Sequence, residues 1–302
     1  MKKTHIIAVL CHKGGVGKTT TTAALAGALV KGHPSKKVLI LDCDEQSNIK
    51  TIFGVKLNEA EGGVASMLLQ NTAPGRVKVS VRPQIDVILS GGRAMRDFEK
   101  THANTPDSEL ILKRRMDSFD RAYDFILIDS PPALSLISSN IAMYADHCLL
   151  PCTPDLLSIV GVRGTLFFLE NLETYFREKG LSPSRVLGVV PTMYDQRRIL
   201  DMTILDDLQR MANADLTRGG IVFDPIRSDI KIKTAQVRRK LITEAFPTSK
   251  AAMDYEKLAT DILARISDQG IPKVTISRKQ KEKSQPRTAK PELTTPPSFG
   301  EV

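Results

Sequence analysis

The sequence predicts a doubly wound α/β fold, in which a mostly parallel β-sheet is covered by helices on both faces. Short runs of almost entirely apolar residues recur along the chain, and segments with helical periodicity lie between most of them. Strands without alternation of apolar and polar residues are typical of strands buried on both faces. Strand and helix in regular succession indicate βαβ units and therefore parallel pairing. Hydrophobic residues make up 41% of the 302 residues, which is enough for a full core.

The expected elements follow one another in this order along the chain. The strand-like runs span residues 6–11, 38–41, 85–89, 125–128, 148–150 and 186–190. The expected helices span residues 18–31, 107–121, 136–145, 156–179, 200–212 and 249–266. Near the end of the chain hydrophobic periodicity disappears and Lys, Ser, Thr and Pro take over. We therefore expect one domain over residues 1–268 and a disordered, basic, proline-rich tail over residues 269–302.

The composition of the chain indicates which partners and which cellular compartment to expect. The formal charge is +9, which favours an anionic partner such as nucleic acid or a membrane surface. Part of this charge lies in residues 273–302, with seven Lys or Arg against three Glu, and the remainder of the chain is also basic. No run of eighteen apolar residues occurs. The four cysteines lie in apolar segments and form no disulfide pattern, so we expect a cytoplasmic protein.

A glycine-rich segment between the first strand and the first helix carries the strongest chemical signal. It reads Cys11-His12-Lys13-Gly14-Gly15-Val16-Gly17-Lys18-Thr19-Thr20. Glycines let the backbone curl so that its N–H groups point at phosphate oxygens, and the helix N-terminus adds positive potential. Lys18 is then expected to reach the β and γ phosphates, and the Thr19 hydroxyl to bind Mg²⁺. A glycine-rich turn without a ligand is the alternative.

This loop departs from the general pattern G-x-x-x-x-G-K-[ST] in an informative way. His12 stands where the first glycine belongs, and a second lysine, Lys13, precedes the glycine pair. Residues 13–20 resemble the deviant Walker A box of the ParA/MinD superfamily, which also contains the nitrogenase iron protein and the arsenite-pump ATPases. The resemblance implies that all eight residues bind ATP. It also implies that Lys13 reaches the nucleotide of a partner subunit in an ATP-dependent homodimer. A surface lysine without such a role is the alternative.

A second segment with carboxylates follows the run 38–41. It reads Asp42-Cys43-Asp44-Glu45-Gln46-Ser47-Asn48 and resembles the first switch of that family, usually Asp-x-Asp-Pro-Gln-x-Asn. The resemblance places Asp42 in the outer shell of Mg²⁺. It assigns to Asp44 the orientation or deprotonation of the attacking water. Glu45 replaces the usual proline, which predicts a less stiff loop. Two solvated loop aspartates are the alternative.

A third segment, Asp129-Ser130-Pro131-Pro132, ends the apolar run 125–128. It resembles a Walker B strand followed by the family's second switch, and Asp129 would hold Mg²⁺ through water opposite Thr19. Further along, residues 189–195 resemble the start of the adenine pocket, and we expect Met193 and Pro225 to contact the base. Ordinary connections between strands and helices are the alternative there.

Basic residues gather in two later segments. They are Arg197 and Arg198, followed by Arg227, Lys231, Lys233, Arg238, Arg239 and Lys240 against one acidic residue, Asp229. Such a cluster can neutralise several phosphates and give sequence-independent, salt-sensitive DNA binding. Arg197 and Lys231 match positions that bind DNA nonspecifically in ParA proteins. We expect Arg197, Arg198, Arg227, Lys231 and Lys233 to contact DNA, with a solvated basic face as the alternative.

The resemblance spans about residues 4–266 and implies a Mg²⁺-dependent ATPase of plasmid or chromosome partition. Such a protein would be nucleoid-associated, and its hydrolysis would be stimulated by a ParB-like centromere-binding partner. The alternatives are a ParA-like factor that places a protein cargo or conjugation machinery, a MinD-like site-placement ATPase, and a nucleotide-dependent enzyme or reductase component. The terminal Pro-Pro-Ser-Phe-Gly-Glu-Val is not an amphipathic helix, so we expect no membrane partner.

Overall fold

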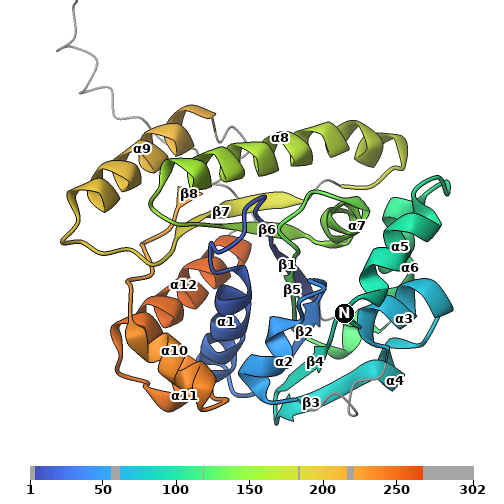
Figure 1. Cartoon of the computed structure of the whole chain (residues 1–302), viewed down its shortest axis with the longest axis horizontal. Helices are drawn as coiled ribbons and strands as arrows, with labels where there is room; N and C mark the ends of the chain where they lie inside the picture. The colour runs from blue at the N-terminus through green and yellow to red at the C-terminus, as the bar shows by residue number, and fades with distance from the viewer. Residues whose placement is uncertain (1–3, 56–61, 118, 183, 216–220, 268–302) are drawn as a thin grey trace, which may run out of the picture. The chain divides into compact units, whose positions relative to one another are not determined.

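An eight-stranded sheet lies at the centre of the described chain (Figure 1). The computed structural model describes residues 4–55, 62–117, 119–182, 184–215 and 221–267; the predicted tail over 269–302 lies outside them. The strand order is β3-β4-β2-β5-β1-β6-β7-β8. The strands are β1 (His5–Val9), β2 (Val38–Asp42), β3 (Lys78–Arg82), β4 (Ile85–Ile88), β5 (Phe125–Asp129), β6 (His147–Cys152), β7 (Arg185–Pro191) and β8 (Ile221–Val222).

Pairing within this sheet is parallel except between β3 and β4. The predicted mostly parallel, doubly wound class is therefore confirmed. The six predicted strand runs all correspond to strands, whereas the edge strands β3 and β8 were not predicted. β3 has no fully buried residue, and β8 has two residues. Neither of them forms the continuous apolar run by which the inner strands were recognised.

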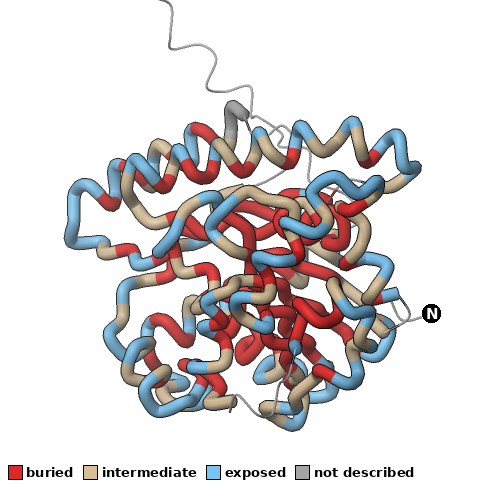
Figure 2. Tube along the Cα trace, turned by 45° about the vertical axis from the view of Figure 1, so that its right-hand side comes forward, coloured by how far each residue is buried: buried red, intermediate tan, exposed pale blue. Residues whose placement is uncertain are grey.

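Helices cover both faces of the sheet, and each face has its own hydrophobic core. One core includes residues of α3 (Gly63–Gln70), α4 (Pro74–Val77), α5 (Ala94–His102), α6 (Ile111–Met116), α7 (Leu136–Tyr144), α8 (Leu156–Glu178) and α9 (Ile199–Asp215). The other includes residues of α1 (Lys18–Gly32), α2 (Asn48–Phe53), α10 (Ile230–Val237), α11 (Ile242–Ala245) and α12 (Lys250–Ser267). Buried residues concentrate between these layers (Figure 2). Along β1, Ile7 belongs to one core and Ala8 to the other, as expected for strands buried on both faces.

The predicted helix over residues 107–121 is wrong as a single element. The segment instead contains a 3₁₀ turn at Ser108–Leu110, the short helix α6, and a second 3₁₀ turn at Asp120–Ala122. The buried Asn140 explains the first break, because its Oδ1 accepts a hydrogen bond from the N–H of Leu112 at 2.9 Å and its amide donates to the carbonyl of Ser108. Asp117 then leaves helical geometry with ψ of 133° and ends α6. A long-range side-chain contact thus outweighs local helical periodicity.

Candidate functional site

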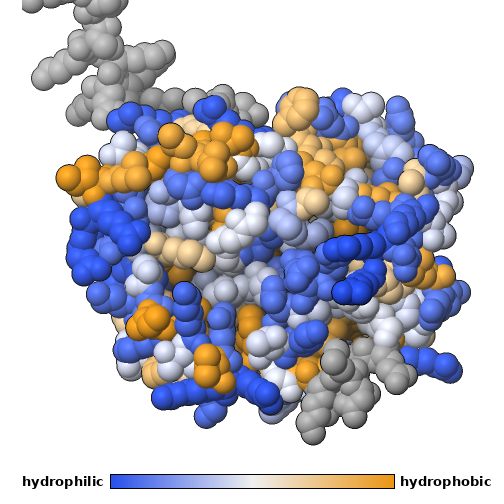
Figure 3. Space-filling view, in the orientation of Figure 1, coloured by the Kyte–Doolittle hydropathy of each residue, from blue (hydrophilic) through white to orange (hydrophobic). Residues whose placement is uncertain are grey.

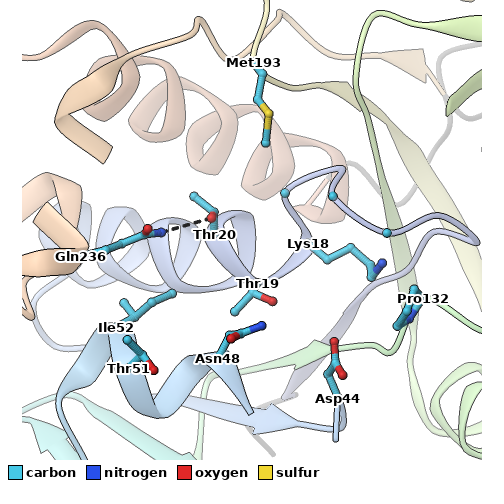
Figure 4. Close-up of a pocket in the computed structure, with 13 residues that line it drawn as sticks. Lys18, Thr19, Thr20, Asp44, Asn48, Thr51, Ile52, Pro132, Met193 and Gln236 are labelled. Atoms are coloured by element: carbon cyan, nitrogen blue, oxygen red, sulfur yellow. Dashed lines mark hydrogen bonds between the residues drawn. The ribbon is translucent and has the colours of Figure 1, made fainter. Parts of the chain in front are cut away.

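A cavity of about 380 Å³ opens at the carboxyl ends of the central strands (Figure 4). Its lining includes the glycine-rich loop, the first turn of α1, Asp44, and residues of α2. Three side chains distant in sequence complete the lining, namely Pro132, Met193 and Gln236. Ligands of open α/β sheets bind at this edge, where the strand order reverses direction on either side of the first strand. The structure therefore brings together most of the residues that the sequence assigned to nucleotide binding.

The glycine-rich loop has the backbone geometry that phosphate binding requires. Gly15 and Gly17 have φ of +79° and +86°, which lie in the left-handed region open to glycine. Val16 between them is buried, and its carbonyl accepts a hydrogen bond from the Thr192 hydroxyl at 2.8 Å. α1 begins at Lys18, directly after Gly17. The helix N-terminus and the loop N–H groups therefore face the same cavity, which suits an anionic ligand.

The side chain of Lys18, the first residue of α1, folds back against the loop. Its Nζ donates to the carbonyl oxygens of Lys13 at 2.7 Å and Cys11 at 3.2 Å. Burial lowers the pKa of Lys18, while the nearby Cys11, Asp129 and Asp44 side chains favour its charged form. The hydrogen bonds of this buried ammonium go to neutral carbonyl oxygens, so among the described residues it has no counter-charge in hydrogen-bond contact. Phosphate oxygens in the cavity would supply that counter-charge.

Two buried carboxylates stand side by side at the ends of β2 and β5. Asp42 and Asp129 are register partners in the parallel pairing of these strands, and both are fully buried. Burial raises the pKa of Asp42 to about 7, against the opposing hydrogen bonds from the Ser47 hydroxyl at 2.9 Å and the Asp44 N–H at 3.2 Å. Burial, reinforced by Asp42, also raises the pKa of Asp129, and the Thr19 side chain opposes this shift.

The donor chemistry of this pair fits Mg²⁺. Neither carboxylate oxygen of Asp129 has a well-oriented hydrogen-bond partner among the described residues. A buried acid without such partners, close to the hydroxyl of Thr19, supplies the hard oxygen donors that Mg²⁺ prefers. The described residues contain no cluster of three or more His, Cys, Asp or Glu able to hold a metal by themselves. A magnesium ion here would therefore take its remaining ligands from water and nucleotide phosphates, as is usual for this ion.

The loop after β2 separates its two acidic side chains. Asp44 lines the cavity, and its Oδ1 accepts a hydrogen bond from the Gln46 N–H at 3.1 Å. Glu45 instead forms an ion pair with Arg96 of α5, and this hydrogen-bonded contact lowers the pKa of Glu45. The residue in place of the family's proline is therefore tied to another helix. Asp44 is the acid of this loop that lines the cavity.

Lys13 is engaged by α8. Its Nζ donates to Asp155 Oδ1 at 2.6 Å and to the Ser158 hydroxyl at 2.8 Å. Asp155 is also the N-cap of α8 and accepts from the Ser158 N–H at 2.9 Å. Burial acts to raise the pKa of Asp155, but hydrogen bonds from Lys13, Thr153 and Ser158 hold it well below the usual range. α8 approaches closely because Gly161 lacks a Cβ, which would lie 3.1 Å from the carbonyl oxygen of His12.

The two residues expected at the adenine base differ in position. Met193 lines the cavity, has φ of +56° and is 48% exposed, so its side chain lies open to a ligand. Pro225 is outside the lining of this cavity in the described structure. The Ile226 N–H donates to the carbonyl of Pro191 at 2.8 Å, which keeps this segment beside the end of β7. Base contacts by both residues stay predictions.

The residues that we expect to contact DNA differ in their exposure and in their ion pairs. The guanidinium of Arg197 forms two hydrogen bonds with Asp195, at 2.7 and 2.9 Å, yet the side chain is 85% exposed. Arg198 is also exposed. Arg227 binds Asp254 through three close contacts, the shortest 2.6 Å, which hold α12 beside the segment that follows β8. These contacts already occupy the guanidinium of Arg227.

Lys231 and Lys233 both lie exposed on α10. The ammonium of Lys231 and the guanidinium of Arg238 lie over the Phe246 ring, at 5.9 and 5.2 Å from its centroid. This stacking gives the two cations defined positions on the surface. The assignment of these residues to DNA stays a prediction.

Sequence reasoning missed several residues of the site. Asp155 and Ser158 hold Lys13 from a distance of more than 140 residues, and Gln236 reaches the cavity from α10. The sequence Thr153-Pro154-Asp155 before α8 is typical of a helix N-cap, and this pattern carries no information about a contact with the loop. Nothing in the local sequence of Gln236 marked it as a lining residue.

A phosphate loop between a buried strand and its helix, with carboxylates at the ends of two neighbouring strands, defines a P-loop nucleotide-binding protein. Residues 4–180 match a family described as AAA domain, which covers more than half of the chain. The chromosome-partitioning ATPase Soj of Thermus thermophilus is 30% identical over 267 residues, which cover 88% of this chain and 98% of Soj. The chain therefore belongs to the ParA family of the ParA/MinD superfamily, as the sequence predicted.

Solved structures agree with this fold. A variant of McdA from Cyanothece in complex with ATP has a TM-score of 0.76 at 21% identity and covers 87% of this chain and 98% of its own. A putative plasmid partition protein of Borrelia burgdorferi bound to AMPPNP has a TM-score of 0.67 at 21% identity and covers 88% and 99%. Among the described residues, no helix combines the length and apolar character needed to cross a bilayer.

Proposed function

We propose that this chain is a Mg²⁺-dependent ATPase that partitions DNA. In this proposal ATP closes a homodimer, the dimer binds nonspecific DNA in the nucleoid, and a ParB-like partner stimulates hydrolysis and release. The observation that supports it best is the phosphate loop placed against the buried pair Asp42 and Asp129. The similarity to a chromosome-partitioning ATPase over nearly its whole length points to the same biological task.

In this proposal, several residues in and beside the cavity take part in hydrolysis. The loop N–H groups and Lys18 bind and orient the phosphates, and the Thr19 hydroxyl, Asp42 and Asp129 hold the magnesium shell. When bound, Mg²⁺ neutralises charge on the β and γ phosphate oxygens. Asp44 accepts a hydrogen bond from the attacking water and orients it toward the γ phosphate. Burial of the carboxylates excludes solvent and strengthens these electrostatic contacts.

Pairing of two chains is supported by the surface beside Lys13. Leu156, Leu157 and Val160 in the first turns of α8 are 69%, 71% and 63% exposed. Figure 3 shows hydrophobic side chains gathered over α8 and α9. Exposed apolar side chains of this kind mark association surfaces. The α8 part of this surface adjoins Asp155 and Ser158, which hold Lys13, so a second subunit there would lie within reach of this lysine.

Nonspecific DNA binding is supported by the exposed cations of α10 and of the segment before α9. Lys231, Lys233, Arg197 and Arg198 extend into solvent, where a phosphate backbone can replace their water or their acidic neighbours. These side chains offer no fixed pattern of hydrogen bonds to base edges. We therefore expect binding that follows salt concentration and not DNA sequence.

Filter binding of nonspecific duplex DNA tests the proposal. We expect strong retention with ATP and Mg²⁺, and weak retention with ADP or without nucleotide. Equal retention in all three conditions would contradict a nucleotide-gated protein. A ParB-like protein added to the ATP complex should raise the hydrolysis rate, and Asp44→Ala should keep ATP bound while removing this stimulation.

A further inference from the structure

Helix α10 connects the basic surface to the nucleotide cavity. Lys231, Lys233 and Val237 on this helix are exposed, and Val237 is 84% exposed. Gln236 points the other way and lines the cavity, with its Nε2 donating to the Thr20 hydroxyl oxygen at 3.2 Å (Figure 4). Thr20 lies in the first turn of α1 and is the last residue of the phosphate-loop sequence. One short helix therefore carries exposed cations and a side chain that reaches the nucleotide site.

The end of α10 is also packed against α2, which follows the Asp42–Asn48 switch segment. Arg239 follows α10 with φ of +54°, and its side chain lies against Gly54 at the end of α2. A Cβ on Gly54 would lie 2.6 Å from Cδ of Arg239, so this contact depends on glycine. Asn48 and Thr51 of α2 line the cavity themselves. α10 thus contacts two elements that face the nucleotide.

The junction of these helices is not completely filled. A small, partly open pocket of about 20 Å³ lies between α1, α2, α10 and α11, and its lining includes Thr20, Ile52 and Gln236. Side chains that line a pocket have fewer partner atoms than those of a close-packed core, so rearrangement there is less costly. Thr20 and Gln236 are joined by a neutral hydrogen bond, which contributes little net free energy compared with a bond to a charged phosphate.

We propose that Gln236 is a positioning residue that couples nucleotide occupancy to the basic surface of α10. This inference rests on the proposed function, since it names how that function is regulated. A phosphate oxygen that accepts a hydrogen bond from the Gln236 amide draws this amide away from the Thr20 hydroxyl. The end of α10 then moves relative to α1, and Lys231 and Lys233 move with it. Coupling requires that DNA binds the two arrangements with different affinity, and reciprocity then requires DNA to strengthen ATP binding equally.

The test uses the full chain with Gln236→Met, which keeps the side-chain volume and removes the amide. Val237→Ala is the matched control, because it alters the next residue of α10 on the solvent side. Affinities for nonspecific duplex DNA are measured with a non-hydrolysable ATP analogue, with ADP and without nucleotide. Affinities for the analogue are measured with and without DNA, and a thermal midpoint is recorded for every variant.

In Gln236→Met we expect the ratio of DNA affinities with ATP analogue and with ADP to fall about fivefold, the factor that corresponds to one hydrogen bond. The strengthening of analogue binding by DNA should fall by the same factor, which a purely structural role would not produce. Val237→Ala should keep both ratios. Gln236→Asn shortens the amide below the reach of Thr20 and should repeat the result if the methionine variant is poorly folded.

Wild-type ratios in both Gln236 variants would overturn the inference and leave the proposed function intact. Equal DNA affinity with and without nucleotide in the wild-type chain would instead overturn the proposed function, and the coupling with it. A loss of thermal stability that accompanies unchanged ratios would assign Gln236 to folding alone and also overturn the inference.

Discussion

The phosphate loop and α10 present their polar groups in opposite ways. The loop presents backbone N–H groups that left-handed glycines hold in place, and its fully buried Val16 anchors it. α10 presents exposed lysines, and the position of Lys231 depends on a neighbour, Phe246. A site formed by backbone N–H groups depends on residues that are contiguous in the sequence. A surface formed by side chains depends also on the residues that the fold packs around them. The phosphate loop could therefore be predicted from the sequence, whereas the surface of α10 could be predicted only in outline.

Of the substitutions considered, removal of the Lys18 side chain should have the largest effect, and it tests the phosphate loop. Lys18→Ala should weaken ATP binding by about a hundredfold, because a charge-assisted contact to the phosphates is lost. Titration with a fluorescent ATP analogue measures this change. Lys31→Ala removes a lysine at the far end of the same helix, where its Nζ pairs with Glu256 at 2.5 Å, and should bind ATP normally. Comparable losses in both variants would show that the loop lysine has no special role.

The pH dependence of Mg²⁺–ATP binding is a second test of the nucleotide site. The folded-state pKa of Asp42 is raised to about 7, so its carboxyl carries a proton over much of the range below neutrality. A cation must displace that proton, and the apparent affinity for Mg²⁺–ATP should therefore rise with pH, by up to about tenfold from pH 6 to pH 8. Isothermal titration calorimetry at several pH values measures it. Asp42→Asn should flatten the profile.

Substitutions among the predicted DNA contacts test the α10 side. Lys233→Glu should weaken DNA binding about fivefold at low salt and reduce the salt slope, without altering ATP affinity. Arg227→Ala should leave DNA affinity within about twofold and cost about 1 kcal/mol of unfolding free energy, because its guanidinium binds Asp254. Filter binding and thermal unfolding separate the two effects. A larger DNA defect in Arg227→Ala than in Lys233→Glu would reverse this division of roles.

The contact between Lys13 and α8 predicts the smallest effect. Asp155→Asn keeps a good N-cap for α8 and removes the charge that holds Lys13. We expect about threefold more dimer at a given ATP concentration, measured by sedimentation, because Lys13 is then freer to reach a partner's nucleotide. Lys13→Ala should abolish ATP-induced pairing in either background. Unchanged pairing in Asp155→Asn would show that this contact does not restrain the lysine.

The sequence was sufficient for the inner strands, the order of the layers and the contiguous loop, because each leaves a local pattern. Burial on both faces produced the apolar runs, and the turn before α1 required its glycines. Edge strands β3 and β8 left no such pattern, and Asn140 broke a helix that periodicity favoured. Asp155 and Gln236 reach the loop from distant helices, so only packing could show them.

Under the proposed function, the paired acids at the ends of β2 and β5 would make the stability of this protein depend on the supply of Mg²⁺ and ATP. Since burial raises the pKa of both groups, folding takes up protons, and stability from this source falls as pH rises from about 4 toward 7. At neutral pH the metal–nucleotide complex of the proposed function would offset this cost, because it would bind only the folded chain. Depletion of ATP would then increase the unfolded fraction and expose the chain to proteases.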